Sequence, residues 1–248
     1  MTDMFAALAR TELKLLRREP VVLVFTLVFP IVTVLVLGGV FDPDDPAFAG
    51  AAPDDYYVAG YLGIVIAAVG LIGLPVQLAG YRERGVLRRL AASPFPSWMV
   101  PLAQLAVGMV LVAAGMVALL ATAGVAYDVS APEQPVRVVL GAIVGAAAIL
   151  SVGLLLGRLL PSARAAQAVG LVLFLPQMLL SRTGPPPEAM DGALRTVSDW
   201  LPLTHVVAAV QDPWLGYGDG GRHLLAVVGI LIAATVGWVA VGRRNRVV

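Results

Sequence analysis

The chain contains no cysteine among its 248 residues, and only 13% of those residues are charged. The absence of cysteine excludes disulfides, thiolate catalysis and cysteine-ligated metal sites, and it leaves the redox compartment open. Soluble domains carry about 25% charged and about 45–50% apolar residues, whereas 59% of this chain is hydrophobic. One soluble core of this length cannot bury that excess, so the composition predicts an integral membrane protein.

Residues with catalytic chemistry are also scarce. Lys14 is the only lysine and lies in no glycine-rich loop, so no P-loop for ATP is present. His205 and His223 stand eighteen residues apart and form no His-Glu-x-x-His motif, so we expect them at loops or rims rather than on a metal. We therefore predict no catalytic residue, metal site or cofactor on this chain, and the net charge of +1 predicts no nucleic-acid partner.

Six apolar runs are about as long as the roughly 20 residues that a membrane helix needs. They predict an all-α polytopic membrane protein with a single domain over residues 1–248. The spans are expected at residues 21–40, 57–80, 98–127, 136–156, 165–180 and 224–241.

Charge is distributed unevenly between the two sides that these spans define. Only Arg137, Arg182, Arg195 and Arg222 fall on the side opposite the termini, and the other thirteen of the seventeen basic residues fall on the terminal side. Twelve of the sixteen acids, including the pairs 44–45 and 54–55, fall on the opposite side, where we expect solvated loops. The positive-inside rule then places both termini on the cytoplasmic side of the membrane. The Arg-, Ala- and Gly-rich composition indicates a bacterial source, so we expect this membrane to be a bacterial plasma membrane.

Residues 1–19 precede the first span and predict an amphipathic interfacial helix. Arg10, Lys14, Arg17 and Arg18 share one face, and apolar residues cover the other. Such a helix lies flat against the headgroups, with its basic face toward anionic lipid or the cytoplasm.

The interiors of the spans carry no ionisable residue, which disfavours ion-coupled transport. They do carry Gln77, Gln104, Gln167 and Gln177. Two interpretations stay open for these glutamines: hydrogen bonds between helices, or the lining of a path for a substrate.

The segment YRERGVLRRLAASPFP, residues 81–96, packs four arginines between two apolar runs. Gly85 permits a sharp turn out of the second span. Val86, Leu87 and Leu90 are spaced to form an apolar knob, and Arg84, Arg88 and Arg89 can meet acidic groups around a groove. The alternative is a basic loop held at anionic headgroups.

Three stretches resemble the ABC-2 type transporter permeases, a family that includes daunorubicin-resistance-type exporters. They are ARTELKLLRREPVVLVFTLVFPIVTVLVLG, ERGVLRRLAASPFPSWMVPLAQL and WLPLTHVVAAV. The second is similar to the family's Glu-x-Gly-x-Leu-x-x-Leu-x-x-Ser-Pro segment. The resemblance implies a cytoplasmic coupling helix that docks on a separate ATP-binding subunit, with the family pattern falling on Glu83, Gly85, Leu87, Leu90, Ser93 and Pro94.

The resemblance further implies a permease with a second permease subunit, homodimeric or paralogous, and two ATP-binding subunits that hold ATP and magnesium. It also implies short outer helices, which we expect near residues 188–197 and 203–211. A hydrophobic or amphipathic substrate suits spans without charge. A drug or antibiotic is the first expectation, with multidrug efflux or antibiotic resistance as the role, and a lipid or glycan is the second. The alternative function is a membrane anchor for a cytoplasmic partner that transports nothing.

Overall fold

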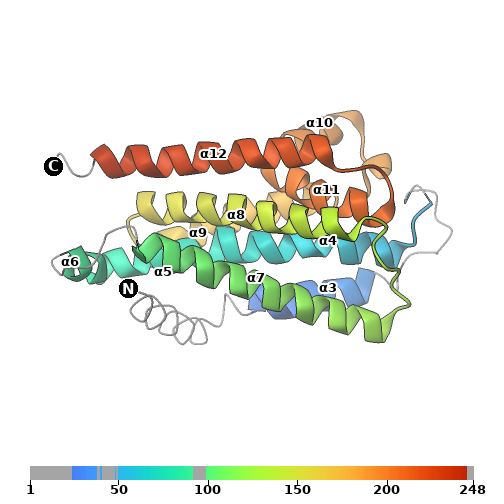
Figure 1. Cartoon of the computed structure of the whole chain (residues 1–248), viewed down its shortest axis with the longest axis horizontal. Helices are drawn as coiled ribbons and strands as arrows, with labels where there is room; N and C mark the ends of the chain where they lie inside the picture. The colour runs from blue at the N-terminus through green and yellow to red at the C-terminus, as the bar shows by residue number, and fades with distance from the viewer. Residues whose placement is uncertain (1–23, 38–39, 41–47, 49, 92–98, 245–248) are drawn as a thin grey trace.

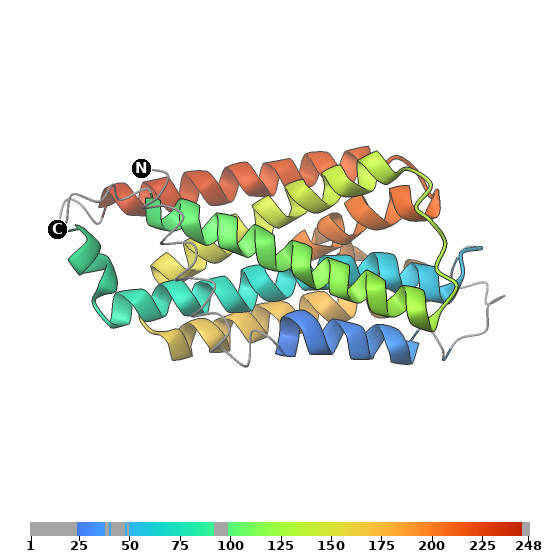
Figure 2. The ribbon, with the colours of Figure 1, turned by 60° about the horizontal axis from the view of Figure 1, so that its bottom comes forward.

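The computed structural model describes residues 24–37, 40, 48, 50–91 and 99–244. These residues form helices and connecting turns, and no strand occurs among them. The long helices run side by side along one axis (Figures 1 and 2). The all-α class predicted from composition is therefore confirmed for the described part of the chain.

The helices follow one another in the order η1 (Val24–Val28), α3 (Phe29–Leu37), α4 (Pro53–Ala67), η3 (Ala68–Gly73), α5 (Leu74–Glu83), α6 (Val86–Ala91), α7 (Met99–Ala126), α8 (Pro135–Leu159), α9 (Ala163–Leu180), η4 (Pro187–Ala189), α10 (Gly192–Trp200), α11 (Pro202–Leu215) and α12 (Gly221–Arg244). Helices η1 and η3 are π-helical and η4 is a 3₁₀ turn.

Five helical segments are long and apolar enough to cross a membrane: Pro53–Glu83, Met99–Ala126, Pro135–Leu159, Ala163–Leu180 and Gly221–Gly242. They coincide with the second to sixth predicted spans. The first predicted span is described only from residue 24 to residue 37, where it is helical, and the interfacial helix predicted for residues 1–19 lies outside the described residues. The chain is a multi-pass membrane protein.

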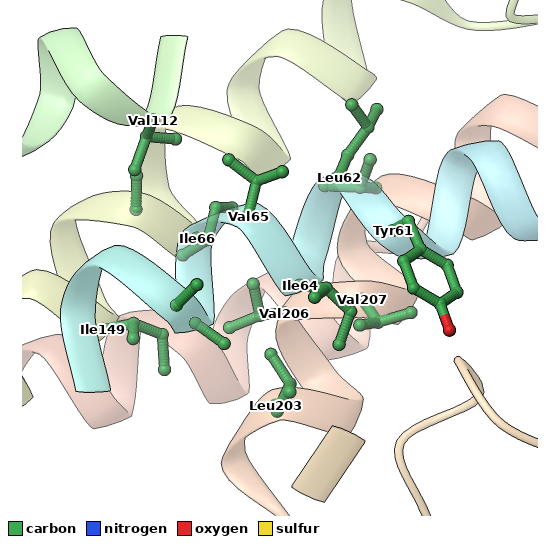
Figure 3. Packing of buried hydrophobic residues seen from close by; sticks show 14 of the residues in the cluster. Tyr61, Leu62, Ile64, Val65, Ile66, Val112, Ile149, Leu203, Val206 and Val207 are labelled. Carbon is green, nitrogen blue, oxygen red and sulfur yellow. The ribbon is translucent and has the colours of Figure 1, made fainter. Parts of the chain in front are cut away.

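The rod formed by α4, η3 and α5 lies at the centre of the bundle. Its most apolar stretch is 94% buried, which fits a helix that is hydrophobic all round. Ile66 of α4 packs among Ile149 of α8, Val206 of α11 and Val112 of α7 (Figure 3). The second span is therefore enclosed by its own chain, whereas the other spans expose one side.

Glycines allow the helices around this rod to approach closely. A Cβ at Gly153 of α8 would collide with the backbone carbonyl of Gly70 in η3, and one at Gly141 would collide with the carbonyl of Ala209 in α11. Close backbone contact through small residues is how membrane helices associate where apolar burial gives no driving force.

Two short helices follow α9, with bounds that differ from those expected. The helix expected at residues 188–197 begins later, as α10, because the carboxylate of Asp191 caps it by accepting from Leu194 N at 2.8 Å. The helix expected at 203–211 extends in both directions as α11, which ends at Leu215 and is capped by Gly216 with a positive φ of 74°.

The expectation that Asp55 is a solvated loop acid is wrong. Asp55 is in the first turn of α4 and is 8% exposed. Its carboxylate accepts a hydrogen bond from Ser130 N at 2.8 Å. The buried acid therefore fixes the connection between α7 and α8 against the start of α4.

Candidate functional site

The arginine-rich segment forms a turn and a short helix at one end of the bundle. Helix α5 ends at Glu83, and Gly85 follows in the left-handed region with φ of 69°. Helix α6 then leaves the bundle axis, at the same end as the last turns of α12 (Figure 1). The turn expected at Gly85 is present, because only glycine adopts this conformation without steric cost.

Glu83 makes a contact that the sequence did not indicate. Its Oε2 accepts a hydrogen bond at 3.1 Å from the backbone N–H of Ala163, the first residue of α9. A carboxylate at this position also interacts favourably with the helix dipole. Next to it, the guanidinium of Arg82 donates to the backbone carbonyl of Arg158 near the end of α8. The end of the second span is thus attached to the turn between α8 and α9.

Three of the cations of this segment lie at the surface. Arg82, Arg84 and Arg89 are exposed, and the Arg84 guanidinium lies 5.9 Å from the centre of the Tyr81 ring, within cation–π range. Leu87 is half-buried and packs against the hydrophobic core, so it anchors α6 to the bundle rather than projecting freely as a knob.

Arg88 and Leu90 belong to α6, whereas Ser93 and Pro94 lie outside the described residues. The structure thus places six of the eight residues predicted for coupling on one continuous turn and helix.

The four predicted glutamines separate into different environments. Gln177 links two helices, since its Oε1 accepts from Leu203 N at 3.2 Å and its Nε2 donates to Leu173 O at 3.0 Å. Gln167 is half-buried on α9. Gln77 and Gln104 are brought together, because both line a narrow space between the η3–α5 rod and α7, which has room for about one water molecule.

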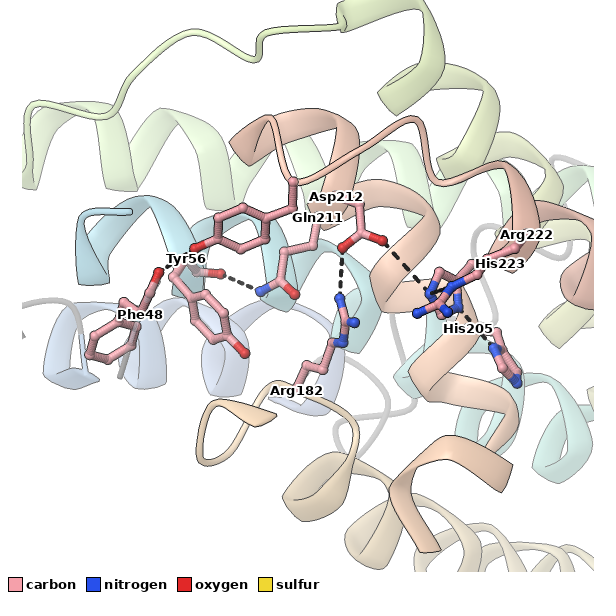
Figure 4. Close-up of polar contacts among 9 residues, drawn as sticks. Phe48, Tyr56, Arg182, His205, Gln211, Asp212, Arg222 and His223 are labelled. Atoms are coloured by element: carbon pink, nitrogen blue, oxygen red, sulfur yellow. Dashed lines mark hydrogen bonds and ion pairs between the residues drawn. The ribbon is translucent and has the colours of Figure 1, made fainter. Parts of the chain in front are cut away.

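Sequence reasoning missed a polar cluster that joins the connection after α9, α11 and the start of α12 (Figure 4). These elements lie at the end of the bundle opposite α6 (Figure 1). Arg182 is 2.7 Å from Asp212, and Asp212 is 3.7 Å from His223. The Nδ1 atoms of His223 and His205 are 3.0 Å apart, and Arg222 Nε donates to His223 Nε2 at 3.1 Å. We call these five residues the histidine cluster.

The protonation of the histidine cluster follows from its contacts. Because His223 Nε2 accepts from Arg222, its Nδ1 carries the proton and donates to His205 Nδ1. Burial lowers the pKa of His205, and Asp199 opposes this shift less strongly.

Among the described residues, no three His, Cys, Asp or Glu side chains are grouped to hold a metal ion. In the sequence the two histidines are eighteen residues apart, and this separation does not predict that they are in contact.

The described residues therefore combine five long apolar spans, a buried second span and a basic helical turn beyond it. No curated protein matches the chain, and no solved structure matches it. The family model described as ABC-2 type transporter matches residues 4–213, which include the arginine-rich segment and all the glutamines singled out above. The chain belongs to the ABC-2 type transporter membrane family.

Proposed function

We propose that this chain is the permease subunit of an ATP-driven exporter and that residues 83–94 are its coupling segment. The observation that carries the proposal is the attachment of this segment: Glu83 is bonded to the first residue of α9, and Arg82 is bonded to the end of α8. A force applied to α6 from outside the bundle would be transmitted directly to α8 and α9 through these two hydrogen bonds.

ATP hydrolysis is assigned to two separate ATP-binding subunits, since members of this family pair with such subunits. Arg84 and Arg89 supply exposed cations for an acidic rim on that partner. A second permease subunit, identical or paralogous, would complete the path. The exported molecule is hydrophobic or amphipathic, with a drug or antibiotic first and a lipid or glycan second, because no fixed charge lines the spans.

The first experiment tests orientation. The natural chain lacks cysteine, so Arg84→Cys introduces a single thiol without further engineering. A membrane-impermeant maleimide should label this thiol only after the bacterial cells are opened. Arg195→Cys, on exposed α10 at the opposite end, should be labelled in intact cells. The reverse pattern would end the coupling assignment.

The second experiment tests docking. Arg84→Glu combined with Arg89→Glu should abolish co-purification of the ATP-binding subunit and its stimulated ATPase activity. Arg195→Glu makes the same change at the other end and should leave both unchanged. ATP-dependent movement of a labelled hydrophobic dye into inside-out vesicles distinguishes an exporter from a membrane anchor, which would bind the partner but move no dye.

A further inference from the structure

The last span, α12, lies along the edge of the bundle (Figures 1 and 2). Only 11% of its most apolar stretch is buried, against 94% for the second span. Among the described helices it packs mainly against α8 and α11, and neither α5 nor α6 is a main neighbour. Movement of the coupling segment therefore needs an intermediate group to reach α12.

The side chain of Arg158, one residue before the end of α8, extends to the last turns of α12. Its guanidinium carbon lies 4.7 Å from the centre of the Trp238 ring, within cation–π range. Its Nη1 donates to the Trp238 carbonyl at 3.4 Å. A Cβ at Gly242 would lie 2.7 Å from Arg158 Nη2. The guanidinium therefore occupies a site formed by one ring, one carbonyl and the space that Gly242 leaves open.

The backbone of Arg158 is bonded to the end of the second span. The last four carbonyls of an α-helix lack an intrahelical donor, and the Arg158 carbonyl is one of them, because α8 ends at Leu159. The guanidinium of Arg82, directly before the coupling segment, donates to this carbonyl. Arg158 is thus joined to α5 through its carbonyl and to α12 through its side chain. We call Arg82, Arg158 and Trp238 the Arg158 link.

The contacts of Arg158 with α12 depend on the shape of arginine. A planar guanidinium can stack on an aromatic face and donate sideways at the same time, whereas the ammonium of lysine is a compact point charge. Arg158 is half-buried, so ions in the solvent screen its interactions less than they would at an exposed position. Displacing the Arg158 backbone would therefore pull on the end of α12.

The opposite end of α12 is held by the histidine cluster. His223 in the first turn of α12 lies with its Nδ1 3.0 Å from Nδ1 of His205 in α11. Polar contacts thus attach α12 at both ends. A displacement of Arg158 would tilt α12 about its outer end.

We propose that Arg158 is a positioning residue that transmits movement of the coupling segment to α12, the last span. The inference rests on the proposed function for the source of that movement, an ATP-binding subunit docked on α6. The link itself belongs to this chain and can be tested without the partner.

The test on the chain alone measures the separation of α7 and α12. Spin labels at Leu102→Cys near the start of α7 and Val239→Cys near the end of α12 occupy exposed positions. Pulsed electron paramagnetic resonance in nanodiscs gives the distance between them. Arg82→Gln and Arg158→Met should each shift this distance, and the double variant should shift it no further than Arg158→Met, because both break one link. Additive shifts, or no shift from either change, would overturn the link.

Arg164→Gln is the matched control for charge. It removes an exposed cation from the start of α9, at the same end of the bundle, and should leave the distance unchanged. Trp238→Phe keeps an aromatic ring and should retain most of the wild-type distance, whereas Trp238→Leu should not. Equal effects of the two would contradict a role for the ring.

A glycine substitution keeps the test decisive if Arg158→Met fails to fold. Gly242→Ala retains the charge but fills the space that the guanidinium occupies, so it should reproduce the shift expected of Arg158→Met. Gly229→Ala adds the same methyl group to α12 where a Cβ would meet nothing within 4 Å, and it should cause no shift. Identical distances in the two alanine variants would overturn the link.

The complex with the ATP-binding subunit tests transmission. ATP with vanadate should shift the label distance in the wild type but not in Arg158→Met. The variant should keep co-purification and ATPase activity, yet move about fivefold less dye per ATP hydrolysed, the low end of typical coupling between sites. Undiminished transport in Arg158→Met would refute the link alone. No transport by the wild type, with the expected shifts in the isolated chain, would refute the exporter alone.

Discussion

The guanidinium of Arg182 lies 2.7 Å from the carboxylate of Asp212, and the two side chains are only 18% and 13% exposed. This ion pair joins the connection after α9 to α11. Arg182 is also the only non-glycine residue with a positive φ among the described residues, at 64°. A strained backbone and a partly buried ion pair therefore occur at one position, which indicates that the pair holds this connection in place.

Removing one partner of this pair should be costly. Arg182→Met leaves the Asp212 carboxylate without its cation, and we expect a loss of about 3 kcal/mol in stability. Arg182→Gly should lose less, because glycine relieves the left-handed backbone. The double variant Arg182→Met, Asp212→Leu should recover part of the loss. Thermal unfolding of the purified protein measures all three, and a double variant no better than Arg182→Met would contradict the role of the pair.

Acid should weaken the fold through His205. Its pKa is lowered by burial, so the unfolded chain binds the proton more tightly and stability rises with pH between the folded and unfolded pKa values. The contribution is complete above the unfolded value of about 6.5 and is lost as pH falls below it. Thermal stability should therefore drop from pH 7 to pH 5, and His205→Gln should flatten that dependence. An unchanged slope in the variant would rule out this residue as the cause.

Helix packing at Gly153 should not tolerate a methyl group. A Cβ there would meet the carbonyl of Gly70, so Gly153→Ala should destabilise the protein by about 1–3 kcal/mol. Gly229→Ala is the matched control in α12, since a Cβ there would meet nothing within 4 Å. The fraction of monodisperse protein after heating compares the two. Equal behaviour would mean that α8 and η3 are farther apart than described.

The turn at Gly85 should be sensitive to any side chain. Gly85→Ala places a Cβ at φ of 69°, which costs about 1–2 kcal/mol and should misplace α6. We expect weaker stimulation of the partner ATPase with normal expression. Gly192→Ala, at the start of α10 with open space around it, is the control. Full stimulation in Gly85→Ala would show that the turn is not needed for coupling.

Helices marked by a long run of apolar residues were predictable from the sequence. Contacts between side chains far apart in the sequence were not. The second to sixth spans follow from hydropathy because each depends only on its own residues. The turn at Gly85 follows from a local steric preference. The Gly85 region was also marked by a family motif, whereas no motif marks Arg158 or its contacts with Trp238.

Two acidic residues show what the sequence leaves undetermined. Asp55 looked like a solvated acid because the partner that buries it, Ser130, is 75 residues away. The motif that includes Glu83 did not indicate that its carboxylate accepts a hydrogen bond from Ala163, which is 80 residues away. Both outcomes depend on which helices become neighbours, and that is decided by the packing of small residues rather than by local pattern.

The enclosed position of α4 has a consequence for biosynthesis. The helices that cover it, among them α8 and α11, are translated after it. During insertion the second span must therefore face lipid or the translocon until nearly the whole chain has been made. A nascent chain that stops after α9 lacks α11, so it would keep one side of α4 uncovered and should be recognised by membrane quality-control proteases.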